Sequence, residues 1–279
     1  MSRINWTDDK LLARLLNNKS EKSRWDNISV LRSRPSEELF KKCLELTKSK
    51  EQENRSIGID ILAQLGLPPR PFLEQNLKLY FDLLNIETAP EVLMSILYAI
   101  GHNNENLNQK QIEKICSFLD SENEWIKEGL VYALLGIDNL KAIETLIKLS
   151  SDKLSHVRNW ATFGIGTQIE KDSQIIRTAL WNRVNDRHQE TKLEAIVGLT
   201  KRKDNRVIEI IKRELINGEY GTLLFEAIIE TGDKQFLPLL RQNLKLAKDD
   251  SNINPEWIND LEDCINELTK LKDEKRIIA

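Results

Sequence analysis

A ten-residue pattern that recurs seven times is the feature that most constrains how this chain can fold. The pattern begins at Trp25, Ile57, Val92, Ile126, Val157, Thr191 and Leu223. Successive starts are separated by 32, 35, 34, 31, 34 and 32 residues. A near-constant period of this length indicates an architecture in which one small supersecondary unit stacks on the next.

The residues inside the pattern predict α-helices. The first position is mostly apolar, the fifth is small or aliphatic and the ninth is usually aliphatic, so these positions share one helix face. The eighth position is often Ala or Gly, which allows neighbouring helices to approach closely. The tenth position predicts helix ends in the left-handed conformation at Gly66, Gly101, Gly166 and Gly232.

A second set of helices is predicted between these segments, because apolar residues again recur at three-to-four spacing. The segments are 38–49, 73–84, 108–119, 142–151, 173–184, 206–215 and 236–244. Strand-type alternation is not sustained, and the prolines fall in connectors or first helical turns. The chain is therefore predicted to be all-α, a right-handed α-solenoid of about seven helix pairs.

The sequence predicts one solenoid domain over residues 1–279, with its two ends capped by helices. The parts are an N-terminal cap and first repeat (1–35), repeats (36–248) and a C-terminal helical cap (249–279), with the capping helices over 7–17 and 255–272.

Composition favours a soluble protein of the cytoplasm. The apolar runs are far shorter than the roughly 20 residues that span a bilayer, and the start has no apolar segment typical of a secretory signal. Cys43, Cys116 and Cys264 are widely spaced and odd in number, which fits a reducing compartment better than a disulfide framework.

One stretch resembles a known repeat. Asp152, followed by Val157, Arg158 and Ala161, resembles the HEAT repeat, in the variety named after the phycobilisome bilin lyases. The resemblance implies that Arg158 pairs with an acidic connector residue such as Asp152 or Asp186. The alternative interpretation is that Arg158 grips a phosphate or carboxylate.

The resemblance extends over most of the chain. The block 157–204 and the segments 55–66 and 254–265 are similar to a group of bacterial HEAT-repeat proteins with no assigned activity. It implies about seven HEAT-like helix pairs but no particular function, since HEAT repeats serve scaffolds, adaptors, transport factors, lyases and DNA-repair enzymes.

Trp160 is the leading candidate for contact with a partner. It holds the fourth pattern position, where other repeats carry Asp60, Ser95 and Glu194, so this column is expected to face the inner groove. A tryptophan among polar neighbours is typical of an interface anchor. The alternative is that its ring folds onto Phe163 or onto the next repeat.

Aromatic and acidic residues complete the predicted partner-binding set. Tyr98 and Tyr132 are interpreted either as core or as groove surface, and the acidic residues of the groove either suit a basic peptide segment or form a solvated helix face. The predicted set is Trp160, Trp125, Glu194, Asp60, Gln64, Tyr98 and Tyr132.

Catalytic, metal and cofactor sites are not predicted. His102, His156 and His188 lack the spacing of zinc ligands, and the sequence contains no nucleophile elbow or phosphate-binding loop. The expected function is that of a non-catalytic bacterial scaffold, adaptor or inhibitor, which binds another protein or peptide segment along its concave groove.

Two alternatives remain at this point. The repeat type implies a bilin-lyase-like or other ligand-handling role. The stretch 201–213 carries six Lys or Arg against two acids, which permits DNA binding, although the formal net charge of −3 disfavours nucleic acid.

Overall fold

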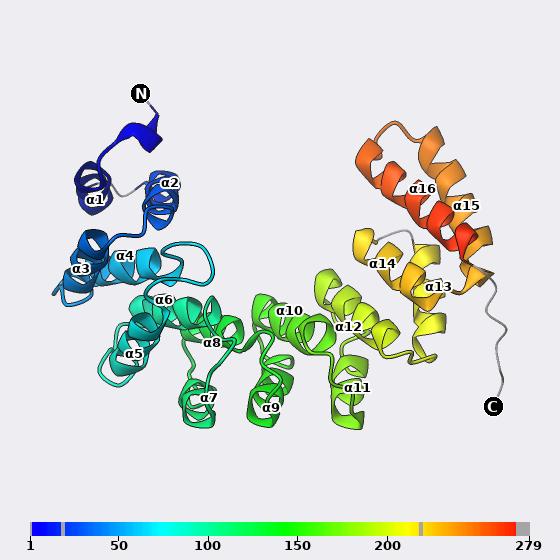
Figure 1. Ribbon diagram of the computed structural model, residues 1–279. Helices are drawn as coiled ribbons and strands as arrows, with labels where there is room; N and C mark the ends of the chain where they lie inside the picture. The colour runs from blue at the N-terminus through cyan, green and yellow to red at the C-terminus, as the bar shows by residue number, and fades with distance from the viewer. Residues whose placement is uncertain (1, 18–19, 218–219, 272–279) are drawn as a thin grey trace. The chain divides into compact units, whose positions relative to one another are not determined.

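The computed structural model describes residues 2–17, 20–217 and 220–271 (Figure 1). These residues form sixteen α-helices and no β-strand, so the all-α prediction is confirmed for them. Residues 272–279 of the predicted C-terminal cap lie outside the described part of the chain.

Every predicted helical segment contains a helix. The seven pattern segments form α2 (Glu21–Arg32), α4 (Gln52–Ala63), α6 (Pro90–Gly101), α8 (Glu124–Leu134), α10 (Ser155–Phe163), α12 (Gln189–Lys201) and α14 (Thr222–Thr231). The intervening segments form α3 (Glu37–Leu46), α5 (Leu73–Leu83), α7 (Gln109–Cys116), α9 (Leu140–Leu149), α11 (Gln174–Trp181), α13 (Val207–Asn217) and α15 (Leu237–Asp249). The terminal helices are α1 (Asp8–Asn17) and α16 (Pro255–Lys270).

The chain divides into two compact units, Met1–Thr145 and Leu146–Ala279. In the first unit α2 packs on α4, α4 on α6 and α6 on α8, and α3, α5 and α7 pack against α4, α6 and α8 (Figure 1). In the second unit α10 packs on α12, α12 on α14 and α14 on α16. Within each unit, helices therefore stack in chain order.

The apolar positions of the pattern form the core. On α6, Val92, Ile96 and Ile100 are fully buried, as expected for residues that share one helix face. Burial of such a side chain contributes about 1.5–3 kcal/mol relative to its exposure to water.

Arginine ion pairs join consecutive helix pairs. Arg158 pairs with the Asp186 carboxylate at 2.8 Å, as predicted, and its guanidinium also donates to the backbone carbonyl of Asp152 at 2.9 Å. Arg55 pairs with Glu87 at 2.7 Å and donates to two carbonyls that lie five and six residues before it, as Arg158 does. The two arginines therefore occupy equivalent positions in their repeats.

The left-handed conformation predicted for four glycines is confirmed for two of them. Gly66 and Gly232 adopt φ values of +83° and +63°, in the left-handed region. Gly101 and Gly166 do not, so the prediction for them is wrong. A Cβ on Gly101 would lie 2.6 Å from the carbonyl oxygen of Tyr132, so this glycine instead permits the close approach of α8 to α6.

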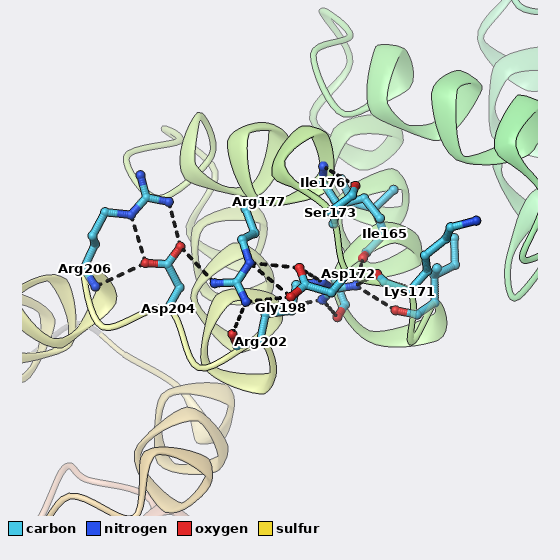
Figure 2. A network of polar contacts seen from close by, with 12 residues as sticks. Ile165, Lys171, Asp172, Ser173, Ile176, Arg177, Gly198, Arg202, Asp204 and Arg206 are labelled. Carbon is cyan, nitrogen blue, oxygen red and sulfur yellow. Dashed lines mark hydrogen bonds and ion pairs between the residues drawn. The ribbon is translucent and has the colours of Figure 1, made fainter. Parts of the chain in front are cut away.

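A π-helical turn, Gly164–Gln168, continues α10 and is held by a buried arginine (Figure 2). Arg202 is 7% exposed, and its guanidinium donates five hydrogen bonds of 2.7 to 3.1 Å. The acceptors are the carbonyl oxygens of Ile165, Gly166, Ile169, Lys171 and Gly198. The guanidinium thus satisfies carbonyls at a helix end that lack intrahelical partners.

A second arginine fixes the first. Arg177 of α11 pairs with Asp172 at 2.6 Å, donates to the carbonyl of Arg202 and lies 3.6 Å from Asp204 (Figure 2). Burial lowers the pKa of Arg202, and the Asp172 carboxylate opposes that shift. Arg202 therefore holds the second unit together and is not a surface charge.

Replacement of Arg202 by leucine is expected to lower the free energy of unfolding by about 3 kcal/mol or more, because several carbonyls would remain buried without a donor. Urea denaturation followed by circular dichroism measures the change. Arg206→Leu is the control, since this exposed arginine contacts the Asp204 carboxylate and the Trp181 ring, and its loss is expected to shift the curve much less than the loss of Arg202. Coincident curves for all three proteins would contradict the structural role of Arg202.

Gly198→Ala is expected to cost about 2 kcal/mol of unfolding free energy. The new Cβ would lie 2.6 Å from the Cα of Gly166, and this backbone collision outweighs the helix-propensity gain of about 1 kcal/mol. Gly221→Ala is the matched control, because its Cβ meets no atom within 4 Å. Thermal unfolding of the two variants side by side should show a clear loss only for Gly198→Ala.

Candidate functional site

A groove of about 890 Å³ crosses four alternate helices of the first unit, α2, α4, α6 and α8. Because α2 packs on α4, α4 on α6 and α6 on α8, residues at corresponding turns of these helices lie next to one another along the groove. Its lining combines aromatic side chains, carboxylates and two arginines.

Aromatic side chains form one part of the lining. The rings of Tyr98 and Tyr132 lie 4.3 Å apart between centroids, and the Tyr98 hydroxyl donates to the Glu128 carboxylate at 2.6 Å. Burial, and then Glu128, raise the pKa of Tyr98. Trp25 is 46% exposed and Trp125 is 38% exposed, so both indoles present apolar surface that no other side chain covers fully.

A closed polar network forms another part. Asp60 is buried and accepts from Arg24 at 2.7 Å, while its backbone carbonyl accepts two bonds from Arg32 at 2.6 and 2.9 Å. Burial raises the pKa of Asp60, and the two arginines, with a hydrogen bond from Ser95, oppose the shift. The charges of Arg24 and Arg32 are therefore engaged within the protein.

Gln64 and His102 extend this network. The Gln64 side chain accepts from Arg32 at 2.7 Å and lies 3.1 Å from Nδ1 of His102. Burial and the neighbouring cations Arg32 and Arg70 lower the pKa of His102, which favours the neutral imidazole.

Unpaired carboxylates follow one edge of the groove. Glu21, Glu53 and Glu91 each stand in the first turn of their helix, on α2, α4 and α6. All three are exposed, and none forms a hydrogen bond or ion pair with another described residue. The groove therefore presents negative charge to solvent.

Five of the seven predicted residues meet at this groove. Asp60, Tyr98, Trp125 and Tyr132 line it, and Gln64 bonds to two lining side chains. The structure places Trp160 and Glu194 in the second unit, on α10 and α12.

Trp160 packs against its own helix. Its ring lies edge to face with Phe163, with centroids 5.6 Å apart and planes at 86°. The ring-on-ring arrangement corresponds to the packing alternative for this residue. Its role in partner contact stays a prediction.

Glu194 lies in an unusual electrostatic environment. Burial raises the pKa of its carboxyl to about 7, and the carboxylates of Glu226 and Glu190 add to the shift, against the nearby Lys201. The group titrates near neutral pH, as few carboxyls do.

Several groove residues were missed by the sequence interpretation. Trp25 and the carboxylates Glu21, Glu53 and Glu91 all line the groove and were not selected. A usable signal was present, since an acidic residue stands in the first turn of α2, α4, α6 and α8.

The basic stretch 201–213 is largely engaged within the fold. Five of its six basic side chains form ion pairs or multiple carbonyl bonds. They are Lys201 with Glu226, Arg202 with its carbonyls, Arg206 with Asp204, Lys212 with Glu209 and Arg213 with Glu214. Their spacing in the sequence therefore does not correspond to a continuous surface of unpaired positive charge.

Within the described ranges, no group of three or more His, Cys, Asp or Glu side chains is arranged to hold a metal ion. All three cysteines are buried, and none of them forms a disulfide. Among the same residues, no helix has both the length and the apolar character needed to traverse a membrane.

The chain is similar to a bacterial protein. Protein YibA of Escherichia coli strain K12 is 29% identical over 254 residues, which cover 88% of this chain and 87% of YibA. YibA of E. coli O157:H7 matches with the same values. No protein-family profile matches the chain.

The similarity extends to the fold. The X-ray structure of E. coli YibA superimposes with a TM-score of 0.73 at 24% identity, covering 96% of this chain and 94% of that one. The all-helical fold is thus shared with YibA.

Glu194→Gln is expected to raise the melting temperature at pH 8 and to leave it unchanged at pH 4. The pKa in the folded state, about 7, exceeds the ordinary value of a glutamate in an unfolded chain, about 4.3. The folded state therefore binds more protons between these values, and the contribution of Glu194 to stability is lost as pH rises through 7.

Melting temperatures of both proteins across pH 4–8 measure this effect. Glu230→Gln, which removes an exposed carboxylate from α14, serves as the control and is expected to follow the wild type at each pH. A Glu194→Gln curve parallel to the wild type would contradict the raised pKa.

Proposed function

We propose that this chain is a non-catalytic interaction scaffold, a cytoplasmic bacterial adaptor or inhibitor that binds a segment of another protein in the groove of the first unit. In this proposal the stacked helix pairs are HEAT-like repeats of a right-handed α-solenoid. The recurrent period and the packing of successive helices within each unit support it.

The observation that carries the proposal is the presence of two half-exposed tryptophans in one groove. Trp25 and Trp125 stand on the first and last of the four helices that line it, and the Tyr98–Tyr132 pair lies on the helices α6 and α8. Aromatic side chains contribute most strongly to protein interfaces when they sit in such concave sites.

The polar lining also favours binding over catalysis. Asp60, Arg24, Arg32 and Gln64 bond to one another, so their charges and donors hold the walls of the groove in place. Rigid walls reduce the entropy lost when a partner binds.

Trp125→Ala is expected to weaken binding of the partner at least about tenfold, as loss of an interface anchor does. The test captures partners from native bacterial lysate on the immobilised full chain, identifies them by mass spectrometry and then titrates the purified partner. Circular dichroism first verifies that the variant is as helical as the wild type.

Ile86→Ala is the matched control, because Ile86 is 74% exposed in the same unit and lies outside the groove. Support requires a partner that the wild type and Ile86→Ala bind equally and that Trp125→Ala binds weakly. A partner held equally by all three proteins, or no partner at all, overturns the proposal.

A further inference from the structure

We infer that the groove of the first unit accepts an extended, basic peptide segment with a lysine or arginine at every third position. The inference rests on the proposed function and specifies the chemistry of the partner. It follows from the charge and the spacing of the groove and from one hydroxyl in its lining that bonds to no other described residue.

The charge of the groove selects a cationic ligand. Its charged lining comprises five carboxylates and two guanidinium groups. The guanidinium groups of Arg24 and Arg32 are bonded within the protein, whereas Glu21, Glu53 and Glu91 have no partner among the described residues. An anionic ligand such as nucleic acid would meet repulsion here, and a basic segment would meet attraction.

The Ser56 hydroxyl supports an extended backbone as the ligand. Ser56 lines the groove, is 6% exposed and forms no hydrogen bond with a described residue. It stands three residues after Glu53 on α4, so both side chains lie on one helix face. An extended peptide has backbone N–H and C=O groups that make no hydrogen bond within the segment, and one of these would bond to the hydroxyl while a basic side chain reaches Glu53.

The spacing of the helices sets the period of the ligand. Glu21, Glu53 and Glu91 occur once per helix, and packed helices lie about 8–10 Å apart. A polyproline II segment has three residues per turn and a rise of about 3.1 Å per residue, so one turn advances about 9 Å. Side chains three residues apart therefore face the same edge and meet successive carboxylates.

The aromatic lining suits long basic side chains. Arg32 lies over the ring of Trp25, with 5.7 Å between the guanidinium carbon and the ring centroid, so the groove already contains one indole that stacks with a guanidinium of the protein itself. Trp125 presents a similar exposed ring at the α8 end of the groove. Arginine stems and guanidinium planes stack favourably on such rings.

The test titrates the full chain with three fluorescently labelled synthetic peptides of twelve residues and reads fluorescence anisotropy. The first carries arginine at every third position among Pro and Ala. The second has the same composition with its four arginines contiguous, and the third replaces each arginine by glutamate. The first is expected to bind at least about tenfold more tightly than the second, and the third is expected not to bind.

Matched variants locate the site. Glu53→Gln with Glu91→Gln is expected to weaken binding of the first peptide about tenfold. Glu74→Gln removes an exposed first-turn carboxylate from α5, outside the groove, and is expected to change nothing. Equal binding of the first two peptides overturns the proposed three-residue spacing. Unchanged affinity of the Glu53→Gln, Glu91→Gln double variant for the first peptide overturns the proposed site.

The outcome is separable from that of the proposed function. Capture of a partner that depends on Trp125, together with no affinity for the arginine peptides, keeps the scaffold and overturns the basic segment. Peptide binding that depends on Glu53 and Glu91, with no partner sensitive to Trp125→Ala, keeps the groove chemistry and overturns the scaffold.

Discussion

The close packing of one helix on the next is the contact on which the rest of the structure depends. Gly101 allows the backbone of α6 to approach the carbonyl of Tyr132 on α8, where a larger residue would collide. The same contact brings the Tyr98 and Tyr132 rings to 4.3 Å. Because α2, α4, α6 and α8 pack in order, their first turns also form a row, and the groove is a direct consequence of this packing.

Arginines in this chain serve mainly to hold repeats together. Arg55 and Arg158 link each helix to the connector of the next pair, and Arg202 closes the π-helical turn. These arginine charges are therefore engaged in contacts within the fold. The chain as a whole carries nearly equal numbers of basic and acidic residues. The charges left unpaired in the groove are acidic, which overall composition does not reveal.

Helices and their order were predictable from the sequence because apolar periodicity is local, but the register was not. The pattern matches Ile57 with Val157, an offset of 100 residues, whereas the identical bonding of Arg55 and Arg158 gives an offset of 103. Ile57, and not Asp60, is thus the counterpart of Trp160. Asp60 still lines the groove because a shift of three residues is nearly one helical turn. The unpaired state of Glu53 depends on tertiary neighbours and has no local signal.

The two units are built from the same sequence pattern but present chemically different surfaces. In the first unit, exposed indoles and unpaired carboxylates share a groove whose arginines are internally bonded. In the second, Trp160 is engaged with Phe163, and burial beside Glu226 brings the pKa of Glu194 to about 7. The exposed carboxylates of the first unit suit recognition of a basic segment, whereas the charge of the surface around Glu194 depends on pH near neutrality.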